Sequence, residues 1–448
     1  MLDHRIGDGP DQSTLLLERP APKHLDRHHW HVDPGSHTQR PLSTFWMTSA
    51  TLNSRDSMTD VVKGGPTADV VVAGGGIAGT AIASELARRG ARVVLIERRG
   101  LAAGATSAAA GVISLASKTP GQLARLARAS LPLFPALIAE VPLDVALRRV
   151  GSLFVYETGE ERSAVLDRVA ALKADGIELE LLPVAAARRL QPLLGDGFLG
   201  AAHAPQDSIV DSAALTRGLA QLAAGRGAEI AVGEEVTGVI RRGGRLESVV
   251  TDRRAISCRW LVNAAGPWSG QLGRRLGRSH PVVPRRGQLV ALAPMAEASA
   301  VRVATARGIF AKQAGSQAGW FSGPALTPAL DGRLVLGGSN EDAGFASGVD
   351  PAVVATIALR ACRLFPSLAG ASVVGAWSGL RPHSLTGAPI LGADPELPGY
   401  VVATGQGGDG IAIAPAIGRF IAELICGGRP DLTVEEFLSG ARSDDGAP

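Results

Sequence analysis

The feature that most constrains the fold is a glycine-rich turn set directly between an apolar strand and a helix. Residues 70–73 (VVVA) are typical of a buried strand, residues 74–79 (GGGIAG) follow with G-x-G-x-x-G spacing, and a helix is expected over 77–89. A second apolar strand, 92–96, leads into Glu97. The first glycine allows a tight turn, the second admits a diphosphate, the third lets helix and strand pack closely, and the acid can accept hydrogen bonds from ribose hydroxyls. The segment therefore predicts a Rossmann-type dinucleotide site.

Two further loops of small residues favour FAD over NAD. Residues 104–111 (GATSAAAG) can press backbone against a flat ring or a phosphate, although a flexible linker has the same composition. Residues 404–411 (TGQGGDGI) follow an apolar strand, and a helix is expected to begin near Pro415. A helix N-terminus there would stabilise the negative charge of a reduced flavin. Three separated glycine loops suit the length of FAD better than that of NAD.

Composition limits the remaining possibilities. A chain of 448 residues with 46% hydrophobic and 19% charged residues is typical of a globular enzyme of two domains. The net charge of +3 is scattered, which gives nucleic-acid binding little support. Three distant cysteines argue against a disulfide framework and a metal site and favour a cytoplasmic location. The most apolar stretch, 70–84, is shorter than the roughly 18–20 residues of a membrane span.

Residues 1–66 differ in composition from the rest of the chain. They are rich in His, Pro, Ser, Thr and Asp and lack helical or strand periodicity, so a disordered extension is expected, with Met47 or Met58 as alternative start sites. The histidines between His4 and His37 leave metal binding as the alternative. The folded part is expected to begin near Thr67.

The remaining pattern alternates between helix and strand, which indicates an α/β (α+β) fold. Asp211 is positioned to cap a helix, and Gly243-Gly244 is expected to turn a hairpin. The other expected helices cover 121–140, 160–174, 184–190, 212–225 and 351–364, and the expected strands cover 151–155, 177–182, 228–232, 260–263 and most of 286–340.

Together these motifs resemble the D-amino acid oxidase-like FAD oxidoreductases, a family that includes glycine oxidase and sarcosine oxidase. Within it the chain looks nearest to the group of glycine oxidase, D-hydroxyproline dehydrogenase and opine oxidase subunits. The resemblance covers residues 67–430 and rests on 70–97, 106–111, 261–269 (LVNAAGPWS), 284–288 (PRRGQ), 377–382 (WSGLRP) and the last glycine loop.

The resemblance implies a Rossmann-type FAD-binding domain and a discontinuous second domain built on a large, mainly antiparallel sheet. The expected FAD-binding domain comprises 67–117, 205–285 and 376–440, and the expected substrate-binding domain comprises 118–204 and 286–375. The cofactor is expected to be non-covalently bound FAD. The candidate cofactor-binding residues are Gly74, Gly76, Ile77, Ala78, Gly79, Glu97, Arg98, Thr106, Ser107, Ala110, Gly111, Val236, Ala265, Gly266, Trp268, Gly407, Gly408, Asp409, Gly410 and Ile411.

The resemblance also implies that Arg381 binds the substrate carboxylate, with a structural ion pair as the alternative. An arginine stays charged and grips a carboxylate through two hydrogen bonds, which would aim the Cα–H at flavin N5. His383 is the second catalytic candidate, and here HSLT follows Arg381-Pro382 where many relatives have an acidic residue. Gln406 stands where a histidine is common.

Other polar residues are weaker candidates. Tyr400 is expected in the core and Tyr156 either in the core or near the pocket. His203 is expected at the surface or in the core. Lys312 could meet a second carboxylate or be solvated, and the segment 313–330 is either a lid or a partner contact.

The predicted activity is FAD-dependent oxidation of the CH–NH bond of a small amine or amino acid, by hydride transfer to N5 and hydrolysis of the imine. The electron acceptor could be oxygen, a quinone or a partner subunit, and the chain could form homo- or hetero-oligomers. The alternatives are a non-catalytic FAD-binding scaffold protein and a flavoenzyme acting on tRNA, which the absence of a basic patch disfavours.

Overall fold

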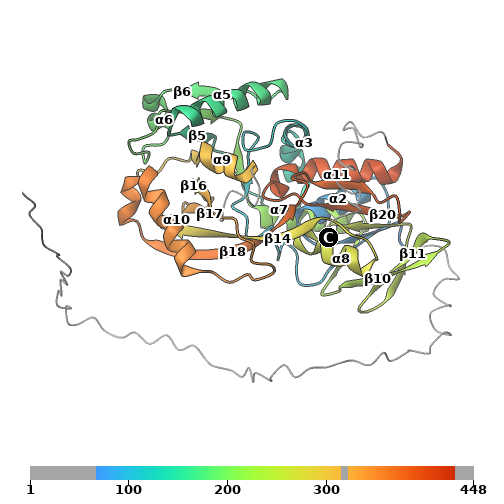
Figure 1. Cartoon of the computed structure of the whole chain (residues 1–448). Coiled ribbons are helices and arrows are strands. Elements are labelled where there is room, and N and C mark those ends of the chain that lie inside the picture. Colours follow the sequence, from blue (N-terminus) through green and yellow to red (C-terminus); the bar gives the residue numbers. More distant parts are fainter. Residues whose placement is uncertain (1–66, 314–320, 429–448) are drawn as a thin grey trace, which may run out of the picture. The chain divides into compact units, whose positions relative to one another are not determined.

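The computed structural model describes residues 67–313 and 321–428 (Figure 1). The predictions for residues 1–66, for part of 313–330 and for the end of the FAD-binding domain at 440 lie outside the described residues. No helix within the described ranges is long and apolar enough to cross a membrane.

The first large sheet has six strands and contains the glycine motif. Its strand order is β19-β20-β13-β1-β2-β9, and all neighbours are parallel except β19 and β20. The strands are β1 (Val70–Ala73), β2 (Val93–Glu97), β9 (Glu229–Val232), β13 (Trp260–Asn263), β19 (Ile390–Ala393) and β20 (Tyr400–Thr404). Helix α2 (Ile77–Arg88) contacts both α7 (Ser212–Gly225) and α11 (Gly410–Cys426).

Strand β1 is buried on both faces. Val70 and Val72 pack in one apolar cluster with residues of α2 and α11, whereas Val71 packs in a second cluster with Leu261 and Val402. A continuous apolar run is typical of a parallel strand covered on both sides. This burial holds the following glycine turn at the carboxyl edge of the sheet.

The second large sheet has eight strands in the order β18-β14-β17-β16-β15-β5-β7-β6. All neighbours are antiparallel except β15 and β5. The long strands β14 and β18 run side by side (Figure 1). The strands are β5 (Ser152–Tyr156), β6 (Glu180–Leu182), β7 (Gly200–Ala204), β14 (Val282–Leu292), β15 (Arg302–Thr305), β16 (Phe321–Pro328), β17 (Leu334–Ser339) and β18 (Val373–Ser384).

Helices and two small sheets complete the described part. Helix α10 (Pro351–Leu364) packs on β14, β16 and β17, and its N-cap Asp350 accepts a hydrogen bond from the Ala352 amide. The other helices are α3 (Gln122–Ser130), α4 (Leu133–Glu140), α5 (Gly159–Ala174), α6 (Val184–Leu190), α8 (Ser269–Arg275) and α9 (Ala306–Gln313). The small sheets join β10 (Val236–Arg242), β11 (Arg245–Thr251) and β12 (Ala255–Ser257), and β3 (Val112–Ile113), β4 (Leu147–Arg149) and β8 (Ser208–Val210).

The fold class and most of the predicted elements are confirmed, including the Asp211 cap, which accepts from the Ala214 amide at 2.8 Å. Three expectations were wrong in detail. The helix expected over 121–140 is interrupted next to Pro132, whose ring lacks an N–H donor. Helix α9 lies within the region expected to be β, and Thr305 Oγ1 accepts from the Gly308 amide at its start.

The third error concerns the last helix. It begins at Gly410 with Asp409 at the N-cap, so Pro415 lies inside the helix and not in its first turn. Part of the glycine loop is therefore helical.

The domain boundaries stay predictions. Strand β18 runs from Val373 to Ser384 and so crosses the boundary expected between 375 and 376.

Candidate functional site

A cavity of about 1080 Å³ lies between the glycine loops of the six-stranded sheet and one face of the eight-stranded sheet. Strand β1 stands between β2 and β13, and the residues that follow these strands line the cavity. The carboxyl edge of a parallel sheet, where connections diverge to either side, is the usual place for a dinucleotide. The lining segments include 76–78, 96–99, 103–106, 108–110, 234–236, 264–268, 379–389 and 405–411.

The N-terminus of α2 opens into this cavity. Gly76, Ile77 and Ala78 line it, and the N-cap Gly76 has no side chain to occupy the free amides. Thr106 Oγ1 accepts a hydrogen bond from the Ile77 amide at 3.1 Å and so attaches the 104–111 loop to the helix start. Exposed amides and the positive end of a helix dipole make an anion site.

Three residues of the candidate cofactor set do not line the cavity. A β-carbon on Gly79 would lie 1.9 Å from the Gly74 carbonyl oxygen, so this glycine permits close packing of helix on strand. Gly111 is in contact with the Val210 backbone, and the Ser107 hydroxyl donates to the Gly104 carbonyl at the surface. The other seventeen residues of the set line the cavity.

Glu97 is fixed at the cavity edge by backbone amides. Its Oε2 accepts from Gly75 N and its Oε1 from Arg99 N, each at 2.8 Å. The Arg98 guanidinium lies 4.5 Å from the centroid of the Trp268 ring and 3.7 Å from Glu235. Arg98 thus lies between the Trp268 ring and Glu235 at the cavity wall.

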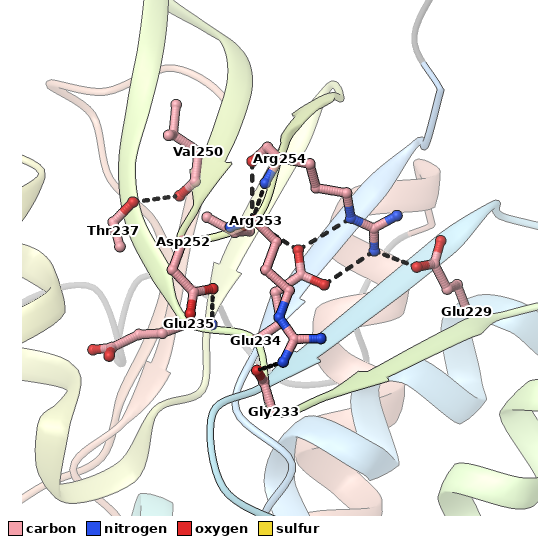
Figure 2. Close-up of polar contacts among 10 residues, drawn as sticks. Glu229, Gly233, Glu234, Glu235, Thr237, Val250, Asp252, Arg253 and Arg254 are labelled. Atoms are coloured by element: carbon pink, nitrogen blue, oxygen red, sulfur yellow. Dashed lines mark hydrogen bonds and ion pairs between the residues drawn. The ribbon is translucent and has the colours of Figure 1, made fainter.

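A polar cluster holds the turn that precedes Val236 (Figure 2). The buried Glu234 carboxylate accepts from Thr251 Oγ1 at 2.7 Å and from Arg254 Nε at 3.1 Å, and Arg254 also pairs with Glu229. The Glu235 side chain points away from Arg254 in Figure 2. Glu234, Glu235 and Val236 all line the cavity, so the cluster fixes one wall.

Two loops that are expected to bind FAD, residues 104–111 and 404–411, meet at strand β18. Trp377 Nε1 donates to the Ala108 carbonyl at 3.0 Å, and a β-carbon on Gly379 would lie 2.4 Å from Ala108 Cβ. The Gly407 amide donates to the Pro382 carbonyl at 2.8 Å. The 104–111 loop, β18 and the last glycine loop therefore form one continuous surface.

Arg381 lies on that surface. Its Nη1 donates to the Ser339 carbonyl at 2.9 Å, and its Cδ lies 3.8 Å from the position of a β-carbon on Gly408. Among the described residues no carboxylate forms a direct ion pair with it. Burial lowers the pKa of the guanidinium, an effect that the more distant Glu341 opposes. Arg381 thus faces the cavity as a cation available to an anionic ligand.

His383 also lines the cavity, where its surroundings favour the neutral imidazole. Burial lowers its pKa from the ordinary 6.5, and the positive charge of Arg285 lowers it further. Arg285 itself is buried and pairs with Asp342 at 2.8 Å.

Sequence reasoning missed Lys118 and Arg302, which both line the cavity. Lys118 Nζ lies 2.7 Å from Asp409 Oδ1, and both side chains are buried. This ion pair joins the 112–119 segment to the N-cap of α11. A single lysine or arginine outside any motif carries no sequence signal that would distinguish it from a surface residue.

The remaining candidates lie away from the cavity. Tyr400 is in the core, as expected, where its hydroxyl accepts from Asn263 Nδ2 at 2.8 Å. Tyr156 is also buried in the core, and His203 on β7 lies 3.5 Å from Glu180. The side chains of Lys312 and most of 313–330 are outside the described residues.

The sequence is similar to known proteins over most of the described residues. Residues 69–424 match the family described as FAD dependent oxidoreductase (DAO). The chain is 32% identical over 364 residues to glycine oxidase of Geobacillus kaustophilus, covering 80% of this chain and 92% of that protein. It is 31% identical over 380 residues to glycine oxidase of Pseudomonas aeruginosa, covering 83% and 99%.

Solved structures show the same fold. Glycine oxidase from Bacillus cereus superposes with a TM-score of 0.74 at 27% identity, over 84% of this chain and 99% of that one. Iminodiacetate oxidase from Chelativorans sp. gives a TM-score of 0.71 at 25% identity, over 82% and 98%. The chain belongs to the DAO family of FAD-dependent oxidoreductases and is an enzyme whose cofactor is FAD.

Proposed function

We propose that this enzyme oxidises the CH–NH bond of a small amine or amino acid that carries a carboxylate. The observation that carries the proposal is Arg381, a guanidinium on the cavity wall whose hydrogen bond in the described structure is to a backbone carbonyl. The names of the relatives, glycine oxidase and iminodiacetate oxidase, support the same substrate class.

The residues of the cavity fit non-covalently bound FAD. The bare N-cap of α2 would offer amides to the diphosphate, and Glu97 at the cavity edge would accept hydrogen bonds from the ribose hydroxyls. Val236, Trp268 and the last glycine loop extend the cavity wall on either side. No cysteine of residues 67–313 or 321–428 lines the cavity. We accordingly assign the FAD-binding domain to 67–117, 205–285 and 376–440, and the substrate-binding domain to 118–204 and 286–375.

When bound, FAD would supply the acceptor for a hydride from the amine carbon, and water would hydrolyse the resulting imine to a carbonyl compound and ammonia or an amine. The protein supplies position and charge. Arg381 orients the substrate by its carboxylate, and orientation is a large part of what such a transfer needs. The N-terminus of α11 places its dipole toward the cavity, where it stabilises negative charge.

His383 takes up the amine proton in this proposal. Amino acids enter as ammonium ions, and the nitrogen lone pair must be free before the C–H bond can be oxidised. A neutral imidazole at the cavity wall can accept that proton, and its lowered pKa keeps it unprotonated at pH 7.

Anaerobic mixing of the FAD-loaded protein with D- and L-amino acids, glycine, sarcosine, prolines and opines tests the proposal. Loss of the oxidised-flavin absorbance with carboxylate-bearing amines is expected, and the matching amines without a carboxylate should react far more slowly. Air is then admitted. Rapid return of the colour identifies oxygen as the acceptor, and slow return identifies a quinone or a partner subunit. Loss of colour with none of these amines would contradict the proposal.

A further inference from the structure

A network of hydrogen bonds supports the part of the cavity wall that carries Arg381. The motif at 284–288 on β14 meets the segment 339–342 at the end of β17. The Arg286 amide donates to the Glu341 carbonyl at 2.9 Å, and the Glu341 amide donates to the Arg286 carbonyl at 2.8 Å. These two hydrogen bonds fix the register between the segments, so their side chains meet directly.

The Glu341 carboxylate is the centre of the network. Its Oε2 accepts from Arg286 Nη2 at 2.5 Å and from Nε at 3.2 Å, and its Oε1 accepts from Gln288 Nε2 at 2.9 Å and from the Ser339 hydroxyl. Burial alone would raise the pKa of this carboxyl group, but the hydrogen bonds from the three residues outweigh it and lower the pKa below the ordinary 4.5. Glu341 is therefore a carboxylate at pH 7, and it does not line the cavity.

Ser339 connects this carboxylate to Arg381. Its hydroxyl donates to Glu341 and accepts from the Gln288 amide at 2.9 Å, so the residue is held on two sides. Its carbonyl oxygen accepts from Arg381 Nη1 at 2.9 Å, and the whole residue is buried. The guanidinium is thus bound to a peptide group whose position Glu341 and Gln288 fix.

Glu341 also acts on Arg381 through its charge. Burial lowers the pKa of the guanidinium, and Glu341 opposes this effect more strongly than Asp409 does. A carboxylate bound directly to the guanidinium would compete with a substrate carboxylate for the same N–H donors. A carboxylate that acts from beyond the Ser339 peptide group stabilises the cation without occupying those donors.

We propose that Glu341 is a positioning residue for the binding of the substrate carboxylate by Arg381. The inference rests on the proposed function and deepens it. Glu341 holds the Ser339 carbonyl through the Ser339 hydroxyl, and that carbonyl sets the direction in which the guanidinium meets the substrate. The motif at 284–288 thereby gains a role, because two of its residues hold Glu341 in place.

Titration calorimetry of the FAD-loaded protein with acetate, cyclopentanecarboxylate and the two corresponding amides tests the proposal. An acid and its amide share one carbon skeleton, so the ratio of their Kd values measures the contribution of the negative charge. The acids are expected to bind more tightly. In Glu341→Gln this preference should fall on the order of tenfold, because members of one hydrogen-bond network are energetically coupled. The amides should bind as before, and Glu341→Asp should retain part of the preference. An unchanged preference in Glu341→Gln would overturn the inference.

A double-mutant cycle distinguishes positioning from structural support. In an Arg381→Gln background, Glu341→Gln should no longer change the preference, because its effect passes through the guanidinium. Glu423→Gln is the matched control and should keep the preference. The Glu423 side chain also pairs with arginine, is 11% exposed like that of Glu341, and does not line the cavity. Equal effects of Glu341→Gln in the two backgrounds, or an equal loss of acid and amide affinity, would show a structural role only.

Ser339→Ala tests the same link if Glu341→Gln does not fold. It removes the hydroxyl that joins Glu341 to Ser339 and leaves both the carboxylate and the carbonyl. A lower preference for the acids is expected. The same preference as in the parent protein would overturn the inference.

The parent protein and Arg381→Gln report separately on the proposed function. Equal binding of acids and amides by the parent protein, or an unchanged preference in Arg381→Gln, would overturn the carboxylate site itself. A preference that is lost in Arg381→Gln but kept in Glu341→Gln would leave the proposed function in place and overturn only the role of Glu341.

Discussion

Arg381 occupies the space that Gly287 leaves empty on the neighbouring strand. A β-carbon on Gly287 would lie 2.1 Å from Arg381 Nη1 and 2.4 Å from Cζ. The two residues belong to β14 and β18, whose register pairs Gly287 with Gly379 and Arg285 with Arg381. The guanidinium thus lies across the backbone of β14, which aims it at the cavity.

Replacing Gly287 with alanine is therefore expected to displace the guanidinium and weaken carboxylate binding. Hydrogen bonds to charged groups contribute about 1.5–3 kcal/mol, so kcat/KM for carboxylate-bearing amines should fall on the order of 10- to 100-fold. Gly375→Ala on β18 is the control, because a β-carbon there meets nothing within 4 Å. Equal kinetics for the two variants would show that the position of Arg381 does not matter.

Removing the arginine itself should have a larger effect. Arg381→Ala is expected to cost about 2–4 kcal/mol in transition-state binding of carboxylate substrates, measured as kcat/KM, with a large rise in KM. Amines without a carboxylate should be affected little. An unchanged KM for the carboxylate substrates would place their binding site elsewhere.

The Lys118–Asp409 pair is expected to hold the last glycine loop in place. Lys118→Met leaves the buried Asp409 carboxylate without its lysine, and breaking a buried pair costs about 3–5 kcal/mol. The melting temperature and the FAD content should both fall. Lys173→Met is the control, since Lys173 is exposed on α5. A stable Lys118→Met protein with full FAD content would contradict this role.

The N-terminus of α2 provides the test of the cofactor site. Gly76→Val places a branched side chain where the diphosphate is expected, and a β-carbon at this position already lies 3.3 Å from Thr106 Oγ1. The purified variant should lack bound FAD while keeping its helical circular dichroism. A yellow Gly76→Val protein would move the diphosphate away from this turn.

The sequence predicted the parts of the fold that local pattern determines. The run from Val70 to Glu97 specified strand, turn, helix and strand within one segment, and each of these elements formed. Helix α9 was missed because its eight residues lie among strands, although Thr305 was available as a cap signal. Pro415 misled because proline is common at helix starts, whereas α11 begins at Gly410 and holds the proline inside.

The sequence predicted only those residues of the candidate site that belong to a contiguous local motif. Arg381 and the glycine loops belong to contiguous motifs, so sequence could nominate them. Lys118 and Asp409 are 291 positions apart, and Arg302 lies in a strand without a motif. The Lys118–Asp409 contact depends on the packing of two segments that are distant in the chain, and the position of Arg302 depends on the strand order of the eight-stranded sheet; no local pattern encodes either.

The pH dependence of the reaction should reveal His383. Its pKa lies below the ordinary 6.5 because of burial and the charge of Arg285, so the imidazole is neutral at pH 7 and becomes charged only as the pH falls through the lowered value. Protonation would add a third positive charge near Arg285 and Arg381 and remove the acceptor for the amine proton. We therefore expect kcat/KM to be constant around pH 7 and to fall only as the pH passes through this lowered pKa. His383→Gln should lower kcat/KM and abolish this acid limb. Persistence of the same limb in the variant would assign it to another group.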